Sequence, residues 1–582
     1  MRIYRLFSFI LPVLSLVLTG CSGRSGVVTV RIIATSDVHG LIFDKDCLDD
    51  TEREGSLAKF ASFIRTQRKQ YGNIIYLDAG DILQGTIDVY QDITAQFYRS
   101  SLPAHAYNVL GCDAIVMGNH DYAVGTASLD RFARGAEFPV LGANACFDVY
   151  GDYLQPYRIL DKEGVRVAVL GITTPVIKYS MPSDRIGDLD IRDAVETAKY
   201  WVPYLRENKN ADVVIGLFHT GLENGRMDNE GVFENSVLRV IDEVPGFDVI
   251  VYGHDHKACC LKVADCEGDS VLLINPGAYA MNAAVATVSI HTDGTDAPVV
   301  LTSGELKDIT HEQPDRSFIR QLSGWYYDVK NYSDSIIGSV SVNMEGNGVL
   351  WRRSSIMDYV HSIQMKFNGA QISLSSPVFT ESYFPSKELK LKDVFSLYRF
   401  ENTMVSVMLK GSEVRDILEY SADLFYNTVS DDSGSMLRLV HNDKGQNVPL
   451  YPVRFLVTAA GIDYVIDVTE PAGQRVKILS LSDGSPFNPD SFYRTTINSY
   501  LYSGDESAVF KATGLSHTDI RERLVVSSMA DIRYYIITDL SLRRETGLPV
   551  KVNPVSKWSL IPESIVSGCL AKDTVNFSVI DK

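Results

Sequence analysis

The stretch Val249-Ile250-Val251-Tyr252-Gly253-His254-Asp255-His256 joins a short apolar run to two histidines. An apolar run of this length, bounded by glycine, is typical of a strand that is buried on both faces. Four earlier stretches repeat the order of an apolar run followed by Asp, Asn or His. They are Val27–Thr35 before Ser36-Asp37-Val38-His39-Gly40, Ile74–Leu77 before Asp78-Ala79-Gly80-Asp81, Ala114–Met117 before Gly118-Asn119-His120-Asp121, and Val213–Phe218 before His219-Thr220-Gly221.

Helical stretches separate some of these strands. Leu57–Gln70 and Ile191–Asn208 are helical in pattern, and Val165–Ile172 and Val271–Ile274 add two apolar runs. Strands that alternate with helices predict a layered α/β domain. The carboxyl ends of neighbouring parallel strands lie at one sheet edge, where α/β proteins bind ligands. If the five strands are neighbours, their polar endings meet at that edge.

The side chains at these strand ends suit metal ions. A lone histidine at a strand end is more often a core or surface residue than a ligand, but five such endings in order indicate one site. Carboxylates, an amide and imidazoles together favour divalent zinc, manganese, iron or cobalt. Two ions about 3.5–4 Å apart can share a carboxylate, polarise a phosphoryl group and activate water. The candidate ligands are Asp37, His39, Asp81, Asn119, His219, His254 and His256.

The charge of the chain restricts its partners. The 582 residues carry a formal net charge of −18 and no long basic run. Binding to a nucleic-acid polymer normally requires a basic surface, so we expect no such partner. Small anionic substrates remain compatible with this charge, because metal ions supply local positive charge.

The N-terminus predicts export. Residues 1–20 combine Arg2 and Arg5 with the short apolar run Phe7–Leu18, as in a signal peptide. Leu18-Thr19-Gly20-Cys21 resembles a bacterial lipobox, which predicts lipidation of Cys21; a plain secretory signal cleaved nearby is the alternative. We therefore expect an extracytoplasmic protein, in the periplasm or at the cell surface, that meets the membrane only through this anchor.

The remaining chain divides into two domains. The strand-and-helix pattern covers residues 27–310, and residues 311–340 form a helical connector with Phe318, Leu322, Trp325 and Val329 on one stripe. A second domain covers residues 341–562, with helices at Ser354–Lys366 and Gly411–Ala422. Residues 563–582 are assigned to a C-terminal tail.

Together these motifs resemble a known family. The five strand endings, in their order, are similar to those of the calcineurin-like metallophosphoesterases. Phe395–Thr403, Gly411–Val414 and Ala460–Tyr464 resemble the C-terminal domain of bacterial 5′-nucleotidases and 2′,3′-cyclic-nucleotide phosphodiesterases. This resemblance implies a four-layer α/β sandwich followed by a smaller α+β substrate-specificity domain.

The resemblance also implies roles for the strand-end residues. His120 would lie beside the phosphate, where it stabilises charge or protonates the leaving oxygen. Asp78, Asp121 and Asp255 are interpreted as loop-forming residues. In the implied ligand sets, Asp37, His39 and His256 hold one metal, Asn119, His219 and His254 hold the other, and Asp81 bridges the two.

The second domain is expected to select the substrate. In the family two aromatic rings sandwich the nucleotide base, and Phe400 matches the first ring by motif. Tyr500 is the candidate for the second ring, with Tyr502 as its competitor. Asn402 would contact the edge of the base, and Asp505 the sugar hydroxyls.

Two departures from the family pattern bear on the substrate. Ala123 stands where the 5′-nucleotidase branch has an aspartate that braces the catalytic histidine, and Gly369–Pro377 lacks the arginines of that branch. A dianionic terminal phosphate loses bidentate recognition without such arginines. Asp81–Thr86 is similar to the Gly-Asp-x-x-Gln-Gly form of the cyclic phosphodiesterase branch. The sequence therefore favours 2′,3′-cyclic or 3′-nucleotides over 5′-nucleotides.

The predicted function is hydrolysis of nucleotides to nucleoside and phosphate by a monomeric two-metal enzyme. One alternative is a hydrolase of another phosphorylated or pyrophosphate-containing small molecule. The other is a metal-containing lipoprotein that binds nucleotides without turnover.

Overall fold

The structure is a computed structural model. It describes residues 26–94, 101–147, 154–180, 187, 189–223, 233–292, 299–346, 348–377, 383–384, 387–398, 402–504, 507–551, 554–575 and 577. The predicted signal peptide and Cys21 lie outside these residues. Within the described chain, every helix is too short or too polar to cross a membrane.

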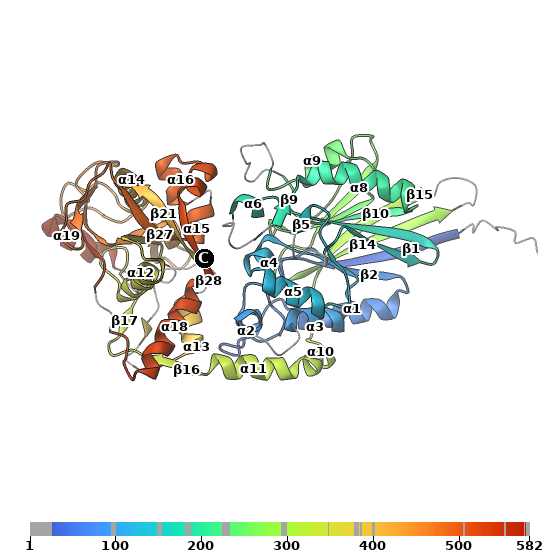
Figure 1. The fold of residues 1–582 in the computed structure, drawn as a ribbon, viewed down its shortest axis with the longest axis horizontal. Coiled ribbons are helices and arrows are strands. Elements are labelled where there is room, and N and C mark those ends of the chain that lie inside the picture. Colours follow the sequence, from blue (N-terminus) through green and yellow to red (C-terminus); the bar gives the residue numbers. More distant parts are fainter. Residues whose placement is uncertain are drawn as a thin grey trace, which may run out of the picture.

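Two sheets form the centre of the N-terminal domain (Figure 1). The first has seven strands in the order β15 (Val299–Asp308), β14 (Asn282–Thr292), β1 (Gly26–Thr35), β2 (Ile74–Asp78), β3 (Ala114–Val116), β4 (Val140–Leu141) and β6 (Leu154–Gln155). The second has six strands in the order β12 (Cys259–Ala264), β13 (Ser270–Asn275), β11 (Val249–Tyr252), β10 (Val213–His219), β8 (Val165–Thr173) and β7 (Tyr157–Lys162). The expectation of a single sheet edge is therefore wrong: three of the five polar endings follow strands of the first sheet and two follow strands of the second.

The two sheets pack face to face because side chains alternate along each strand. Ile32 of β1 and Ile215 of β10 lie in the same inner core. Ile33, the next residue of β1, points outward into a core shared with helices α1 (Leu57–Gln70) and α3 (Leu102–Leu110).

Val214 of β10 points outward on the other side, toward α8 (Ala194–Asn208) and α9 (Val237–Glu243). The order of layers is helices, sheet, sheet, helices, which confirms the predicted four-layer sandwich (Figure 1).

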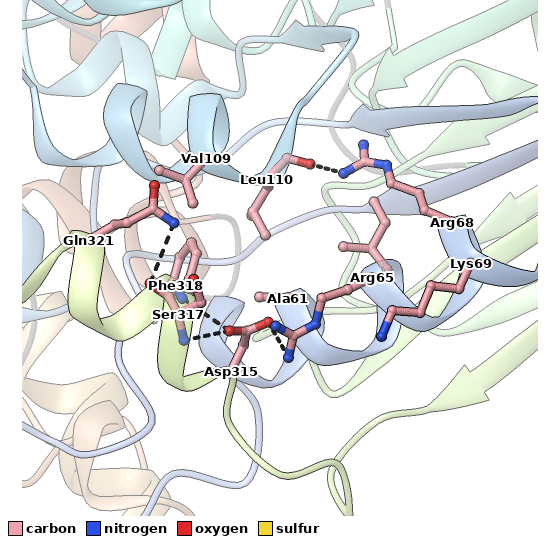
Figure 2. Close-up of a pocket in the computed structure, with 11 residues that line it drawn as sticks. Ala61, Arg65, Arg68, Lys69, Val109, Leu110, Asp315, Ser317, Phe318 and Gln321 are labelled. Atoms are coloured by element: carbon pink, nitrogen blue, oxygen red, sulfur yellow. Dashed lines mark hydrogen bonds and ion pairs between the residues drawn. The ribbon is translucent and has the colours of Figure 1, made fainter.

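Two helices, α10 (Arg316–Gln321) and α11 (Ser323–Ser333), run along one side of the molecule between its two lobes (Figure 1). Asp315 begins α10: its carboxylate accepts from the backbone N–H of Ser317 at 2.7 Å and forms an ion pair with Arg65 of α1 at 2.6 Å. These residues line a cavity of about 320 Å³ between α1, α3 and α10 (Figure 2). The ion pair connects the start of the connector to helix α1 of the N-terminal domain, and among the described residues none of the predicted site residues lines the cavity.

The second domain contains a five-stranded sheet in the order β24 (Thr458–Ala460), β18 (Ile372–Ser375), β27 (Phe492–Asn498), β21 (Thr403–Lys410) and β28 (Leu524–Asp531). Its main helices are α12 (Ser355–Asn368), α14 (Gly411–Phe425) and α18 (Ile532–Glu545). A second, three-stranded sheet has the order β26 (Val476–Leu481), β25 (Ile462–Asp467) and β29 (Lys557–Ile561).

The predicted C-terminal tail begins with a helix, α19 (Glu563–Asp573). Cys569 of this helix is buried, and the Asp573 carboxylate accepts from the backbone N–H groups of Met436 and Leu437. This part of the tail is therefore integrated into the second domain.

Candidate metal centre

Most of the predicted ligands lie in loops whose backbone is strained. Five of these non-glycine residues have positive φ angles: Asp37 (50°), His39 (50°), Asp81 (58°), His254 (82°) and His256 (57°). A bulky residue rarely adopts this conformation, which costs on the order of 1–3 kcal/mol and is concentrated at functional sites. The strain therefore indicates that these loops are shaped for function.

The first cluster consists of Asp37, His39 and His256. Their ligand atoms all lie within 4.8 Å of one another. The Nε2 atoms of His39 and His256 are 3.1 Å apart, and His256 Nε2 is 3.3 Å from Asp37 Oδ1. Two imidazole nitrogens and a carboxylate that converge in this way fit the donor set of a divalent transition metal.

The second cluster consists of Asp37, Asp81 and His219, also within 4.8 Å. His219 Nε2 lies 3.3 Å from Asp81 Oδ2 and 3.1 Å from the amide oxygen of Asn119. Asp37 belongs to both clusters, so its carboxylate connects them. The bridging role of Asp81 stays a prediction.

His254 lies beside these clusters rather than within them. Its ring centroid is 5.2 Å from that of His219, and its backbone N–H donates to Asp37 Oδ2 at 3.1 Å. Its Nε2 lies 2.9 Å from Glu234 Oε1. The structure therefore brings all seven predicted ligands into one neighbourhood.

Charge in this neighbourhood is unbalanced. Burial opposes ionisation of Asp81, but the charges of His219, His120 and His39 and the contact with His219 together outweigh it and hold the pKa of Asp81 well below its usual range. Burial also opposes protonation of His219, yet Asp81 and Asp37 raise its pKa to about 10. Buried carboxylates of this kind take up positive charge, either as protons or as metal ions.

Second contacts fix the orientation of the histidine ligands. Carbonyl oxygens only accept, so His219 Nδ1 donates to Ala79 O at 2.6 Å and His39 Nδ1 donates to Gln84 O at 3.2 Å. Nε2 of each ring is then the nitrogen that would bind a metal ion once its proton is displaced. Such contacts raise both the precision and the basicity of metal-binding histidines.

The three predicted loop-forming aspartates act as expected. Asp121 is the clearest case, because its carboxylate accepts from the backbone N–H groups of Asp81, Ile82, Leu83 and Gly118 at 2.7–2.8 Å. Asp78 accepts from Thr35, Tyr107 and Gly80, and Asp255 accepts from Lys257 and Asn275.

Glycine is required where backbone passes close to a ligand. A Cβ atom on Gly118 would lie 2.1 Å from Asp81 Oδ1, and one on Gly253 would lie 2.6 Å from Asp37 Oδ2. These two glycines therefore leave space for the carboxylates of Asp81 and Asp37.

His120 is exposed at the edge of the clusters. Its backbone N–H donates to Asp81 Oδ1 at 2.9 Å, and its ring centroid is 5.4 Å from that of His39. Its Nδ1 is hydrogen-bonded to the side-chain oxygen of Gln84. This position is compatible with the predicted contact to a phosphate.

In the second domain, Phe400 and Asp505 lie outside the described residues. Asn402 precedes β21, and its amide donates to the Tyr398 hydroxyl at 3.2 Å. Tyr502 is 2% exposed and packs in the core, so its ring offers no free face to a base, whereas Tyr500 is only partly buried. This difference favours Tyr500 over Tyr502.

Two residues near the clusters were not singled out from the sequence. Glu234 contacts His254, as described above. Tyr279 has a φ of 63°, and its ring centroid is 5.6 Å from both His39 and His256. Glu234 does not follow an apolar strand. Tyr279 comes after the apolar run Val271–Ile274 and the Asn275-Pro276-Gly277 turn, but it is not an Asp, Asn or His, the residue types that identified the ligands.

Comparisons with known proteins agree with this geometry. Residues 30–258 match the family model of the calcineurin-like phosphoesterases, and residues 336–513 match the model of the 5′-nucleotidase C-terminal domain. A 2′,3′-cyclic-nucleotide 2′-phosphodiesterase/3′-nucleotidase of Yersinia enterocolitica is 26% identical over 86% of this chain and 84% of its own length.

A trifunctional nucleotide phosphoesterase of Bacillus subtilis is 24% identical over 92% of this chain; the chain spans 39% of that protein's length. The crystal structure of a putative 5′-nucleotidase from Staphylococcus aureus has a TM-score of 0.68 at 20% identity, covering 92% of this chain and all of that one. This last likeness concerns the fold.

The chain is therefore a metallophosphoesterase, a hydrolase of phosphoric esters. It belongs to the family of 5′-nucleotidases and 2′,3′-cyclic-nucleotide phosphodiesterases, in which a calcineurin-like phosphoesterase domain precedes a 5′-nucleotidase C-terminal domain. The resemblance, the fold class and the enzyme class predicted from the sequence are thus confirmed.

Proposed function

We propose that this chain hydrolyses 2′,3′-cyclic and 3′-nucleotides in preference to 5′-nucleotides, and that two divalent ions occupy the clusters around Asp37. The observation that carries the proposal is the convergence of both clusters on one buried carboxylate. When bound, the ions supply Lewis acidity and an activated water. Zinc, manganese, iron and cobalt all suit the donor set.

The residues of the chain have separate tasks in this reaction. Asp37, His39 and His256 would hold one ion, Asn119, His219 and His254 the other, and Asp81 would contact both. His120 would face the phosphate and donate a proton to the leaving oxygen. Phe400 and Tyr500 would stack on the base, with Asn402 at its edge and Asp505 at the sugar.

The preference for cyclic and 3′-nucleotides has support in the second domain. Gly369 ends α12 and Ile372–Ser375 forms the buried strand β18, so Gly369–Pro377 presents no charged side chain to a substrate. The relative from Yersinia enterocolitica bears the name of that activity. A cyclic phosphodiester carries one negative charge and depends less on an arginine pair than a dianionic phosphate does.

We also propose that the chain is an extracytoplasmic monomer held at the membrane by lipid on Cys21, on the strength of the lipobox-like stretch Leu18–Cys21. Detergent-phase partitioning of the wild-type chain and of Cys21→Ser tests this: equal partitioning would refute the anchor.

The activity is tested by phosphate release from 2′,3′-cyclic AMP, 3′-AMP and 5′-AMP, with and without a chelator. In Asp81→Ala, turnover should fall on the order of a thousandfold or more and bound metal should drop, because several kcal/mol of charge stabilisation is lost. Asp483→Ala, an exposed turn residue, is the matched control. Near-normal turnover in Asp81→Ala would refute the two-metal site, and metal binding without turnover in the wild type would indicate a binding protein.

A further inference from the structure

The hydrogen bond that orients the ring of His120 is not made within its own helix. His120 lies on α4 (Asn119–Ala123), and Ala123, three residues further on, has no polar side-chain atom. The hydrogen bond of His120 Nδ1 goes instead to the side-chain oxygen of Gln84, in the loop after β2.

This loop is held firmly at both sides of Gln84. On the N-terminal side, the buried Asp121 carboxylate accepts from the backbone N–H groups of Ile82 and Leu83 at 2.8 and 2.7 Å. On the C-terminal side, Gly85 has a φ of +140°, and a Cβ atom there would lie 2.3 Å from the backbone oxygen of His39. Gln84 is therefore fixed between the loop of Asp121 and the backbone of His39.

Gln84 contacts two functional groups at once. Its backbone oxygen accepts from His39 Nδ1 at 3.2 Å, while its side-chain oxygen accepts from His120 Nδ1. Both contacts are made by Nδ1 and not by Nε2 of the rings. Gln84 therefore couples the orientation of His39, a candidate metal ligand, to that of His120, the candidate proton donor.

We propose that Gln84 is the positioning residue for His120, which it holds with Nε2 directed toward the reacting phosphate. With Nδ1–H held by the amide oxygen, Nε2 is the atom at which the ring takes up a second proton from water; the imidazolium gives that proton to the leaving oxygen as the P–O bond breaks and returns to the neutral ring. This inference rests on the proposed function, since it requires His120 to act on the substrate.

The test compares two leaving groups. The nucleoside alkoxide of 3′-AMP needs a proton, whereas the nitrophenolate of 4-nitrophenyl phosphate leaves without one. Gln84→Ala should lower kcat for 3′-AMP by about tenfold to a hundredfold, leave KM and metal content unchanged, and change kcat for the nitrophenyl ester much less. Gln84→Glu, which keeps an acceptor oxygen, should recover most of the loss. Gln70→Ala, at an exposed helix end, is the control.

A double-mutant cycle with His120→Asn separates the possible failures. If His120→Asn has no effect on kcat for 3′-AMP, the proposed function of His120 is wrong. If His120→Asn lowers kcat about a hundredfold and Gln84→Ala does not lower it, the inference about Gln84 is overturned. It is also overturned if Gln84→Ala releases metal in proportion to lost activity, or if its effect persists undiminished in the His120→Asn background.

Discussion

At the scale of single residues, the candidate metal ligands share one sequence context, because each comes at or after the end of an apolar strand. The residues that support these ligands do not share that context. Asp37, Asp81 and His219 each follow an apolar strand, so the pattern of the sequence predicts them. Their positive φ angles, where present, and the contacts made by Gln84 and Glu234 depend on how distant loops meet, and no local pattern records that.

Glu234 has the contacts expected of a residue that orients His254. Its carboxylate lies 2.9 Å from His254 Nε2, and only 14% of its side chain is exposed. Its backbone oxygen accepts from the hydroxyls of Thr174 and Thr220 at 2.9 and 2.6 Å. The short segment around Glu234 is thereby attached to β8 and β10, and Nδ1 of His254 remains available as a ligand.

Replacing Glu234 with Ala should therefore weaken metal binding. Loss of such an outer contact typically costs about tenfold to a hundredfold in affinity. Competition with a chelating dye measures this affinity without any substrate. Glu234→Gln should retain most of it through its amide oxygen, and Glu207→Ala, exposed on α8, should have none of the effect. Unchanged affinity in Glu234→Ala would contradict the role.

At the scale of elements, local patterns predicted helices and strands well. The helix predicted at Leu57–Gln70 has these same bounds in the structure, and the strand predicted at Val27–Thr35 is observed as Gly26–Thr35. The assignment of strands to two sheets was missed, because β3 and β10 are neighbours across the sandwich and not through backbone pairing. Periodicity reports which residues are buried, but not which layer buries them.

Helix α12 carries a buried histidine that makes stability depend on pH. His361 Nδ1 and Nε2 are hydrogen-bonded to Ser373 Oγ of β18 and Thr458 Oγ1 of β24 at 2.8 and 3.0 Å. Burial lowers the pKa of His361 to about 3. In the unfolded chain the His361 imidazole is protonated below about pH 6.5, whereas in the folded chain it stays neutral down to about pH 3. The stability that neutral His361 contributes is therefore fully present above about pH 6.5 and is lost as the pH falls toward 3.

Between pH 7 and pH 5, the wild-type chain should lose about 2 kcal/mol more unfolding free energy than His361→Gln does. Urea unfolding at each pH measures the difference, and subtraction of the two proteins removes the contribution of the metal ligands. His441→Gln, on the exposed strand β22 (Leu439–His441), is the control. Parallel pH profiles for wild type and His361→Gln would contradict the prediction.

At the scale of the whole molecule, one apolar core joins the two domains. It includes Phe43 of the first domain, Val329 of α11, and Leu540 of α18. Within this core, Tyr90 of α2 (Ile87–Thr94) contacts Phe395 of α13 (Leu391–Leu397), with ring centroids 4.9 Å apart. The sequence predicts both domains but not this contact, because neither residue lies in a motif that refers to the other domain.

Arg533 is the polar centre of this contact between domains. It is fully buried, pairs with Asp531 at 2.7 Å, and lies 4.8 and 4.6 Å from the ring centroids of Tyr90 and Phe395. The Tyr90 hydroxyl donates to the same carboxylate at 3.3 Å. A buried ion pair enclosed by two rings is costly to break, since either partner alone leaves an uncompensated charge.

Arg533→Met should therefore lower the free energy of unfolding by about 3–5 kcal/mol, because the Asp531 carboxylate remains buried without its cation. Arg415→Met, which removes an arginine from an exposed pair, should change it by less than about 0.5 kcal/mol. If Arg533 stabilises the contact between the domains, Tyr90→Leu and Arg533→Met will be coupled by about 0.5–3 kcal/mol in a double-mutant cycle. Strictly additive effects would mean that Arg533 stabilises the second domain alone, and that the two domains are joined only by the apolar core and the connector.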